Sequence, residues 1–387
     1  MNTPLLISLL GALQGILLAL FFFGKSKGRI VTLLLGLYVL VFSLGLLEEW
    51  LGQQKLGLPG NIFLAFVSNS AFLYGPLLYL IVYYLTTNTS RFKVIHILHF
   101  LLFCIGFITR VAMVMKNGSD VKEPDGAGEL IAFEILVIQI LLYNIYAIKR
   151  LDRYQHSILQ TWSNIDQKDL SWLRRLLLLI TGIYAFSFLL THLLLFGIDD
   201  VTPYYILVQV AITVSIYIMS YMVLFRSNLF IPEVRRSIEI SAIEEQNMIE
   251  EPELTRYKKS GLKPEQARKY LEELQYLMDK EKPFKNPDLT VYTLAQQLGI
   301  SRNHLTQVLN EELKLSFFEF INACRIEEAK SLLLHPDFAH LNLPGIAVEA
   351  GYRSKTTFFS NFRKITGHTP QEWVRIQKES DLPPELA

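Results

Sequence analysis

The chain has 387 residues, of which 51% are hydrophobic and 19% are charged, and its formal net charge is +1. Soluble proteins carry about a quarter of charged residues, so this composition excludes an ordinary soluble protein. The small net charge by itself identifies no nucleic-acid partner. Nearly all the long uncharged runs precede Phe225, which predicts a membrane half followed by a soluble half. The two cysteines, Cys104 and Cys324, fall in different halves, so no disulfide is expected.

Seven apolar runs in the first half each approach the roughly 20 residues that a membrane-spanning helix needs. They are 4–23, 30–47, 62–85, 94–115, 130–148, 173–196 and 204–225. No basic residue precedes the first run, so we interpret it as a retained span and not as a cleaved signal peptide. The first half is therefore predicted to be a seven-helix transmembrane domain.

Basic residues between the runs predict how the chain crosses the membrane, because cytoplasmic loops are enriched in lysine and arginine. Alternate loops, together with the end of the last run, hold twelve of them: Lys25, Lys27, Arg29, Arg91, Lys93, Lys149, Arg150, Arg153, Lys168, Arg174, Arg175 and Arg226. The other loops hold three: Lys55, Lys116 and Lys122. This asymmetry predicts that the N-terminus is outside and that the C-terminal half is in the cytoplasm.

Polar side chains inside the predicted spans are candidates for function, because placing them in lipid is costly. Near the outer level of the membrane lie Glu48, Arg110, Glu134, His192 and Gln209. We expect a pocket open to the outside in which Arg110 pairs with Glu134 or with a negative group of a ligand. The alternative is an arginine that reaches the membrane surface and a histidine satisfied within the core.

Two histidines in the fourth run, His96 and His99, are three residues apart, a spacing that suits a metal ion. No third ligand is visible nearby in the sequence, so core or interfacial histidines are the preferred interpretation. We expect no metal and no cofactor.

Three segments outside the spans carry recognisable patterns. The loop 149–175 has Ile158, Leu159, Trp162 and Ile165 spaced for an amphipathic helix, expected on the inner membrane surface or against the soluble half. The acidic stretch 233–253 is interpreted as a linker or a short helix. The stretch 264–282 is predicted to be a helix with one apolar stripe, which leaves packing within its own domain and a dimer contact both open.

Residues 289–373 contain one pattern twice, LAQQLGISRNHLTQVL and IAVEAGYRSKTTFFSNF. In both copies an inward alanine precedes a glycine by four residues, and a serine follows that is suited to capping a second helix: Ala295, Gly299 and Ser301, then Ala347, Gly351 and Ser354. The second helices have apolar faces formed by Leu305, Val308 and Leu309 in one copy and by Phe358, Phe362 and Ile365 in the other. Two short helices joined by a glycine turn are typical of the helix-turn-helix unit.

A predicted helix at 316–334 separates the two copies. Its 19 residues would extend about 28 Å at 1.5 Å per residue, close to the roughly 34 Å between major-groove faces one turn of DNA apart. A rod of this length can hold two recognition helices on successive grooves.

These features resemble the AraC/XylS-type bacterial transcription regulators over about 289–373. The matching residues are Leu294, Ala295, Gly299, Leu305, Arg325, Ala329, Ile346, Ala347, Gly351, Phe358, Phe362, Gly367, Thr369 and Pro370. Trp373 stands where the family usually has tyrosine, and Gln307 and Ser360 stand where it often has arginine. The resemblance implies double-stranded DNA as a partner, with homodimer formation and RNA polymerase as further partners to consider.

The expected DNA-binding residues lie on the polar faces of the two second helices. They are Arg302, Asn303, Thr306, Gln307, Lys355, Thr356, Ser360 and Asn361, with Arg363 and Lys364 expected at phosphates. Arginine and lysine can pair with guanine, and asparagine or glutamine with adenine, in the major groove. The alternative for each residue is an ordinary solvated helix face.

The sequence as a whole predicts an all-α chain with seven transmembrane helices in 1–226, a cytoplasmic linker in 227–260 and a cytoplasmic DNA-binding domain with two helix-turn-helix units in 261–387. The expected function is transcription regulation from the bacterial inner membrane, in contact with the lipid bilayer and in response to an unknown small-molecule or membrane signal. No catalytic motif is visible, so an enzyme is not expected. Two alternatives remain open: a transporter or other membrane protein whose soluble half serves protein contacts, and a non-sensing membrane anchor on a constitutive DNA binder.

Overall fold

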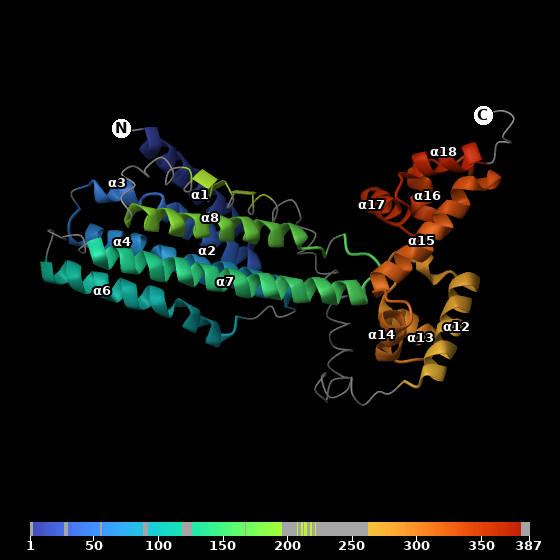
Figure 1. Ribbon diagram of the computed structural model, residues 1–387. Helices are drawn as coiled ribbons and strands as arrows, with labels where there is room; N and C mark the ends of the chain where they lie inside the picture. Colours follow the sequence, from blue (N-terminus) through green and yellow to red (C-terminus); the bar gives the residue numbers. More distant parts are fainter. Residues whose placement is uncertain are drawn as a thin grey trace. The chain divides into compact units, whose positions relative to one another are not determined.

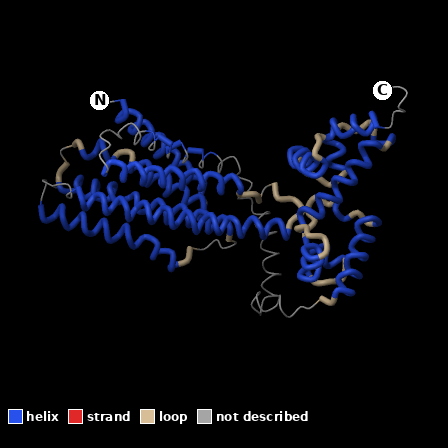
Figure 2. The backbone as a smooth tube through the Cα atoms, in the orientation of Figure 1, coloured by secondary structure: helices blue, strands red, loops and turns tan. Residues whose placement is uncertain are grey.

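The computed structural model describes 3–26, 30–54, 56–87, 92–117, 126–166, 168–195 and 262–380, with isolated positions between 207 and 221 (Figure 1). Within these residues the regular structure is helical (Figure 2), and the only β-type contact there is one antiparallel bridge between Trp162 and Thr290. This confirms the predicted all-α class. The chain divides into two compact units, Met1–Tyr154 with Leu170–Arg236 as unit 1, and Gln155–Asp169 with Ser237–Ala387 as unit 2.

Unit 1 is built from apolar helices. They are α1 (Thr3–Ser26), α2 (Ile30–Gly45), the short α3 (Glu48–Gly52), α4 (Leu58–Asn69), α5 (Tyr74–Thr86), α6 (Leu101–Asn117), α7 (Gly126–Thr161) and α8 (Ser171–Leu195). A 3₁₀ turn joins α4 to α5, and another at Val94–Phe100 precedes α6. Among the described residues, five helical stretches are long and apolar enough to cross a membrane, and α2 is a shorter apolar helix of 16 residues. These stretches coincide with the first six predicted runs, whereas most of 204–225 lies outside the described residues.

The surface of unit 1 is strongly apolar. Helix α2 is buried along most of its length, with Leu35 and Tyr38 in the core. Large apolar side chains elsewhere face outward, including Leu17, Ile108 and Met115, which are 60%, 64% and 69% exposed. Such a surface is unfavourable in water and is compatible with surrounding lipid. Several of these helices could therefore span a membrane.

Helix α7 differs from the sequence prediction. The run was expected to end at Ile148, with a separate amphipathic helix in the following loop, but a single helix of 36 residues continues to Thr161. No glycine or proline interrupts the chain between Ile148 and Thr161, and the basic residues in this stretch do not break a helix. Close to this stretch, the Nε of Arg174 on α8 lies 2.6 Å from Oδ1 of Asp152 on α7.

Unit 2 contains seven described α-helices besides the end of α7. Its helices are α12 (Pro264–Lys280), α13 (Val291–Gln297), α14 (Arg302–Glu311), α15 (Phe317–Leu334), α16 (Leu343–Glu349), α17 (Lys355–Thr366) and α18 (Pro370–Ser380), with 3₁₀ turns at Pro283–Lys285 and Pro336–Phe338. The buried face of α12 includes Ala267, Leu274 and Met278, and Leu274 packs in the core with α13 and α14. The apolar stripe is thus used within its own unit, one of the two alternatives left open.

Helix α15 connects two small cores. Its first half contributes Phe317, Phe320 and Ile321 to a cluster with Leu294, Leu305 and Leu309. Its second half contributes Ile326, Ala329 and Leu332 to a cluster with Ile346, Phe358 and Phe362. One rigid helix therefore carries both helix pairs, α13–α14 and α16–α17, on its two ends.

Candidate nucleic-acid interface

The first helix pair folds through local capping signals. Thr290 caps α13 in a capping box with Thr293, and Ser301 caps α14 by accepting a hydrogen bond from the His304 N–H at 3.1 Å. Between the helices, Gly299 has a φ of +66°, and the Ile300 N–H donates to the Ala295 carbonyl at 3.0 Å. This is the hydrogen bond of a Schellman turn, which ends α13 and directs the chain into α14.

The second helix pair repeats the same geometry. Ser354 caps α17, Gly351 has a φ of +92°, and the Tyr352 N–H donates to the Ala347 carbonyl at 2.8 Å. The expected inward positions Ala347, Phe358 and Phe362 are buried, as are Ala295, Leu305, Val308 and Leu309 in the first pair. Ile365 was expected on the apolar face, but it is 43% exposed because it lies in the last turn, beyond the end of the core.

Helix α15 begins in a full capping box. The Ser316 hydroxyl accepts from the Glu319 N–H, and the Glu319 carboxylate accepts from the Ser316 N–H at 3.1 Å. The hydrogen bonds from Ser316 lower the pKa of Glu319. Lys364 of α17 lies 3.6 Å from the same carboxylate, so the start of α15 is also connected to the second helix pair.

Most of the predicted DNA-contacting residues are accessible. Exposed positions are Asn303, Lys355, Thr356, Ser360, Arg363 and Lys364, and half-buried ones are Arg302, Thr306 and Gln307. The Arg302 guanidinium lies over the Tyr292 ring at 5.1 Å, and Gln307 Nε2 donates to Glu311 at 3.0 Å. The polar faces of α14 and α17 therefore offer basic, amide and hydroxyl groups of the kind that read base edges and phosphates.

Asn361 is an exception to the expected exposure. It is only 8% exposed, and its Nδ2 donates to Oδ1 of Asn322 on α15 at 3.0 Å. Its position one turn after Thr357 turns the amide toward α15 and away from solvent. In this arrangement Asn361 helps to hold α17 against α15 and does not present its amide to a base.

Arg325 is the largest fully buried side chain of the described residues, at 1% exposure. Its guanidinium donates to the carbonyls of Phe284, Asn286 and Ser163, at 2.7, 2.9 and 3.0 Å, and to the Ser163 hydroxyl at 3.1 Å. Burial lowers the pKa of Arg325 to about 10, so the group stays charged at neutral pH. The delocalised charge and fixed donor fork of arginine suit four acceptors that surround one site.

The predicted outer pocket in unit 1 is only partly assembled. His192 Nε2 lies 3.6 Å from Oε1 of Glu134, which joins two of the five expected residues. Within the described residues Glu134 lies beside His192 of α8 and forms no ion pair with Arg110, and the alternative pairing of Arg110 with a negative group of a ligand stays a prediction. Glu48 is exposed, and Gln209 lies outside the described residues.

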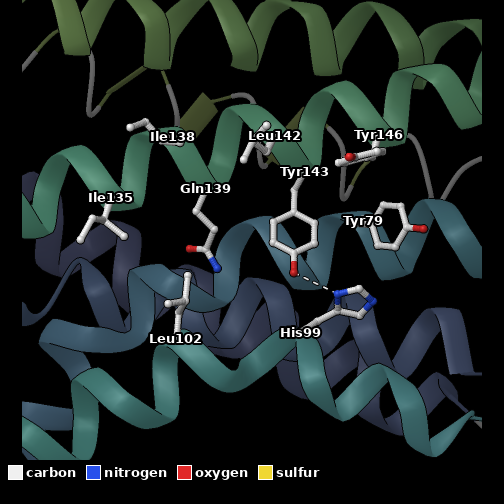
Figure 3. A pocket seen from close by; sticks show the side chains of 9 residues that line it. All are labelled: Tyr79, His99, Leu102, Ile135, Ile138, Gln139, Leu142, Tyr143 and Tyr146. Carbon is white, nitrogen blue, oxygen red and sulfur yellow. Dashed lines mark hydrogen bonds between the residues drawn. The ribbon is translucent and has the colours of Figure 1, made fainter.

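Another cavity in unit 1, of about 580 Å³, was not anticipated from the sequence (Figure 3). It is lined by Tyr79 of α5, His99 and Leu102, and by Ile135, Ile138, Gln139, Leu142, Tyr143 and Tyr146 of α7. His99 Nδ1 lies 2.9 Å from the Tyr143 hydroxyl, so the expected interfacial or core role of His99 is met by a hydrogen bond within unit 1. The Gln139 Nε2 donates to the Phe72 carbonyl at 3.3 Å, whereas its Oε1 is buried and has no partner among the described residues. The spacing of α7 could have shown that these side chains share one face, but not that α5 and α6 complete the cavity.

Comparison with known proteins locates a family match within unit 2. Residues 294–376 match a helix-turn-helix domain family. The melibiose operon regulatory protein of Escherichia coli K12 is 29% identical over 91 residues, or 24% of this chain and 29% of that protein. An HTH-type transcriptional regulator of Staphylococcus aureus is 34% identical over 86 residues, or 22% of this chain and 11% of that protein. The C-terminal domain of AraT, a response regulator from Geobacillus stearothermophilus, is 28% identical, with a TM-score of 0.25, and the match covers 33% of this chain and 94% of that one.

The chain thus spans less than a third of the length of these two curated relatives. Its C-terminal part carries an AraC-type helix-turn-helix domain that is similar to domains of transcription regulators. The expected domain type is confirmed at this level.

Proposed function

We propose that this chain is a sequence-specific DNA-binding transcription regulator embedded in the bacterial inner membrane, with α14 and α17 as its two recognition helices. The observation that carries the proposal is the repeated geometry of α13–α14 and α16–α17, within residues that match a helix-turn-helix domain. Each pair exposes a polar face with at least one basic residue, Arg302 in α14 and Lys355 in α17. Each pair therefore has a face on which DNA contacts are expected.

The length of α15 supports simultaneous DNA binding by the two helix pairs, α13–α14 and α16–α17. Its 18 residues extend about 27 Å at 1.5 Å per residue. Recognition helices fixed near its two ends would meet major grooves about one helical turn, roughly 34 Å, apart. Binding to a two-part site on one face of DNA follows from this spacing.

The apolar helices of unit 1 support a membrane location. Their outward-facing leucine, isoleucine and methionine side chains need lipid, and the distribution of basic residues between them favours a cytoplasmic C-terminal half. DNA and the proposed DNA-binding half would then share one compartment, with the N-terminus outside.

We propose that the cavity in Figure 3 receives the signal. Its aromatic and aliphatic lining suits a small apolar molecule, and the unpartnered Oε1 of Gln139 would accept a hydrogen bond from a donor on that molecule. Thermal unfolding of the full chain in micelles, with a panel of small aromatic amines and alcohols, tests this. A compound should stabilise the wild type and not Gln139→Leu, while the control Gln14→Leu, at an exposed position of α1, should respond like the wild type.

Genome-wide DNA occupancy of the tagged full chain tests DNA binding. We expect discrete peaks that share a two-part site with half-site centres about ten base pairs apart. A variant that combines Arg302→Ala, Lys355→Ala and Thr356→Ala should lose these peaks.

The control for this experiment removes the same positive charge elsewhere in unit 2. Arg268→Ala with Lys269→Ala, at exposed positions of α12, should retain the peaks. Peaks that persist in the triple variant, or an absence of peaks in the wild type under all growth conditions, would contradict the proposal and favour a protein-contact role for unit 2.

A further inference from the structure

We propose that residues 155–169, hereafter the docking segment, occupy the DNA-reading faces of α14 and α17, so that DNA can bind only after the segment leaves. The segment belongs to unit 2 and comprises the last residues of α7, up to Thr161, and most of the loop that leads to α8. The inference rests on the proposed DNA-binding function and adds its regulation. The group that occupies the two DNA-reading faces is thus a segment of this same chain.

Ser163 anchors the docking segment at the middle of unit 2. The residue is 1% exposed, its N–H donates to the Leu289 carbonyl at 3.2 Å, and its own carbonyl and hydroxyl accept from Arg325. The neighbouring Trp162 forms the antiparallel bridge with Thr290, just before α13. The segment therefore fills hydrogen-bonding positions inside unit 2 and does not merely touch its surface.

The docking segment contacts the first recognition helix through Gln160. Its Nε2 lies 3.4 Å from Oδ1 of Asn310 on α14. Asn310 follows Thr306 by four residues and Gln307 by three, so all three share one face of the helix. That face is the one expected to read DNA, and Thr306 Oγ1 is buried on it.

The docking segment contacts the second recognition helix through Asp166. Its carboxylate accepts a hydrogen bond from the Thr357 hydroxyl, in the first turn of α17. Thr357 shares its helix face with Ser360 and Lys364, two exposed residues that are expected at DNA. A carboxylate at a helix N-terminus occupies a position that also favours a phosphate group, so Asp166 and DNA would compete for the same dipole and hydroxyl.

Charged residues surround the end of the docking segment. Lys168 Nζ lies 3.9 Å from the centre of the Trp162 ring. Burial lowers the pKa of Lys168 to about 8. The positive charge of Arg353 also lowers this pKa, whereas the negative charges of Asp288 and Asp166 raise it. Arg353, the residue before the Ser354 cap, is itself paired with Asp288. A basic side chain next to α17 is thus already neutralised within unit 2.

These contacts place one short segment against both recognition helices at once. DNA that bridges α14 and α17 would have to replace Gln160 at Asn310 and Asp166 at Thr357. Because α7 leads into the segment and α8 follows it, movement of either helix can withdraw it without any change in the C-terminal domain itself. Release from the recognition helices is the proposed switch.

The test compares DNA affinity of the full chain in micelles, with a fluorescent mixed-sequence duplex as probe. A release variant with Gln160→Ala and Asp166→Ala should bind about tenfold more tightly than the wild type, as expected for the loss of two hydrogen bonds from a competing segment. The control, Gln266→Ala with Asp279→Ala, removes the same two side-chain types from exposed positions of α12 and should bind like the wild type. Unchanged or weaker binding by the release variant, with retained helix content, overturns the proposal.

A second experiment, by cross-linking, tests the proposal even if the release variant folds poorly. In a chain with Cys104→Ser and Cys324→Ser, a short bis-maleimide should link Gln160→Cys to Asn310→Cys and lower DNA affinity about tenfold. The same reagent on Gln160→Cys alone should have no effect. Full affinity after linkage overturns the proposal, because a docked segment would then be compatible with DNA.

The two proposals fail in different ways. Equal DNA binding by the wild type, the release variant and the linked chain overturns the competition but leaves DNA binding intact. If none of them binds the duplex better than the Arg302, Lys355 and Thr356 triple alanine variant, the DNA-binding function itself fails, and the competition falls with it.

Discussion

At the scale of single residues, two glycines show how neighbouring atoms determine the loss of stability that an added side chain would cause. Gly299 and Gly351 both have positive φ, at +66° and +92°. A Cβ on Gly299 would meet nothing within 4 Å, whereas one on Gly351 would lie 2.6 Å from the Phe284 carbonyl oxygen and 2.8 Å from Lys285 Cα. Both neighbours are backbone atoms, which cannot rotate away.

We therefore expect Gly351→Ala to destabilise unit 2 more than Gly299→Ala does. Gly299→Ala should cost about 1–2 kcal/mol, the strain of a left-handed backbone. Gly351→Ala carries the same strain and in addition displaces the 3₁₀ turn, so its cost should exceed that of Gly299→Ala by about 1–3 kcal/mol, as in overpacked cores. Hydrogen exchange of α16 and α17 in the full chain measures the difference, and equal protection in the two variants would contradict it.

Arg325 leads to a second prediction at the residue scale. Arg325→Met keeps much of the volume but removes this donor from the buried carbonyls of Phe284 and Ser163, which should cost at least about 2 kcal/mol at 1–3 kcal/mol per lost partner. Arg325→Lys keeps the charge but cannot reproduce the fork, so it should recover only part of the loss. Denaturant midpoints of the full chain, followed through unit 2, provide the measurement, and a lysine variant as stable as the wild type would contradict the role of the fork.

The residue scale also shows what could be predicted from the sequence. The glycine turns, the serine caps and the inward alanines follow from spacing within a few residues, and all of them are found in the structure. The burial of Asn361 could not be predicted, because it depends on Asn322 and on Ser163, 159 residues earlier than Asn322. The partners of Arg325 depend on the same long-range contact.

At the scale of elements, the start of α15 provides a test by pH. Removing the cap with Ser316→Ala should cost about 1 kcal/mol. The pKa of Glu319 is lowered in the folded chain. The ionised carboxylate therefore stabilises the fold fully above the ordinary pKa of a glutamate, about 4.3. This stabilisation is lost as the pH falls through the lower pKa of the folded chain.

The matching experiment compares the wild type with Glu319→Gln as the pH is lowered from neutral. The wild type should be more stable at neutral pH, and the difference should shrink below about pH 4. Glu349→Gln, at an exposed position of α16, serves as the control and should show little difference at any pH. A wild-type advantage at Glu319 that persists at the lowest pH would contradict the capping role.

Element boundaries were predictable where a residue type stops a helix. Proline begins α12, and glycine follows α13 and α17 closely. The end of α7 was not predictable, because its apolar pattern stops at Ile148 but nothing in the next residues disfavours a helix. The cavity of Figure 3 was missed for a related reason, since aromatic residues on α5 and α7 are equally typical of lipid-facing surfaces.

At the scale of the whole molecule, the proposed orientation can be measured directly. A green fluorescent protein fused to the C-terminus should fluoresce, because that end is expected in the cytoplasm. Alkaline phosphatase fused at the same place should stay inactive, because its disulfides form only outside the reducing cytoplasm. Active phosphatase together with a dark fluorescent fusion would reverse the proposed topology.

The discontinuity of unit 2 has a consequence for how this protein is made and rearranged. A ribosome synthesises Ser163 more than a hundred residues before Arg325, so the central hydrogen bonds of unit 2 close only late in translation. A fragment that begins after the last apolar run would lack the Ser163 acceptors and would contain the matched domain without its complete folding unit. A gene fusion that moves only the C-terminal half to another protein would likewise transfer the recognition helices and leave their competing segment behind.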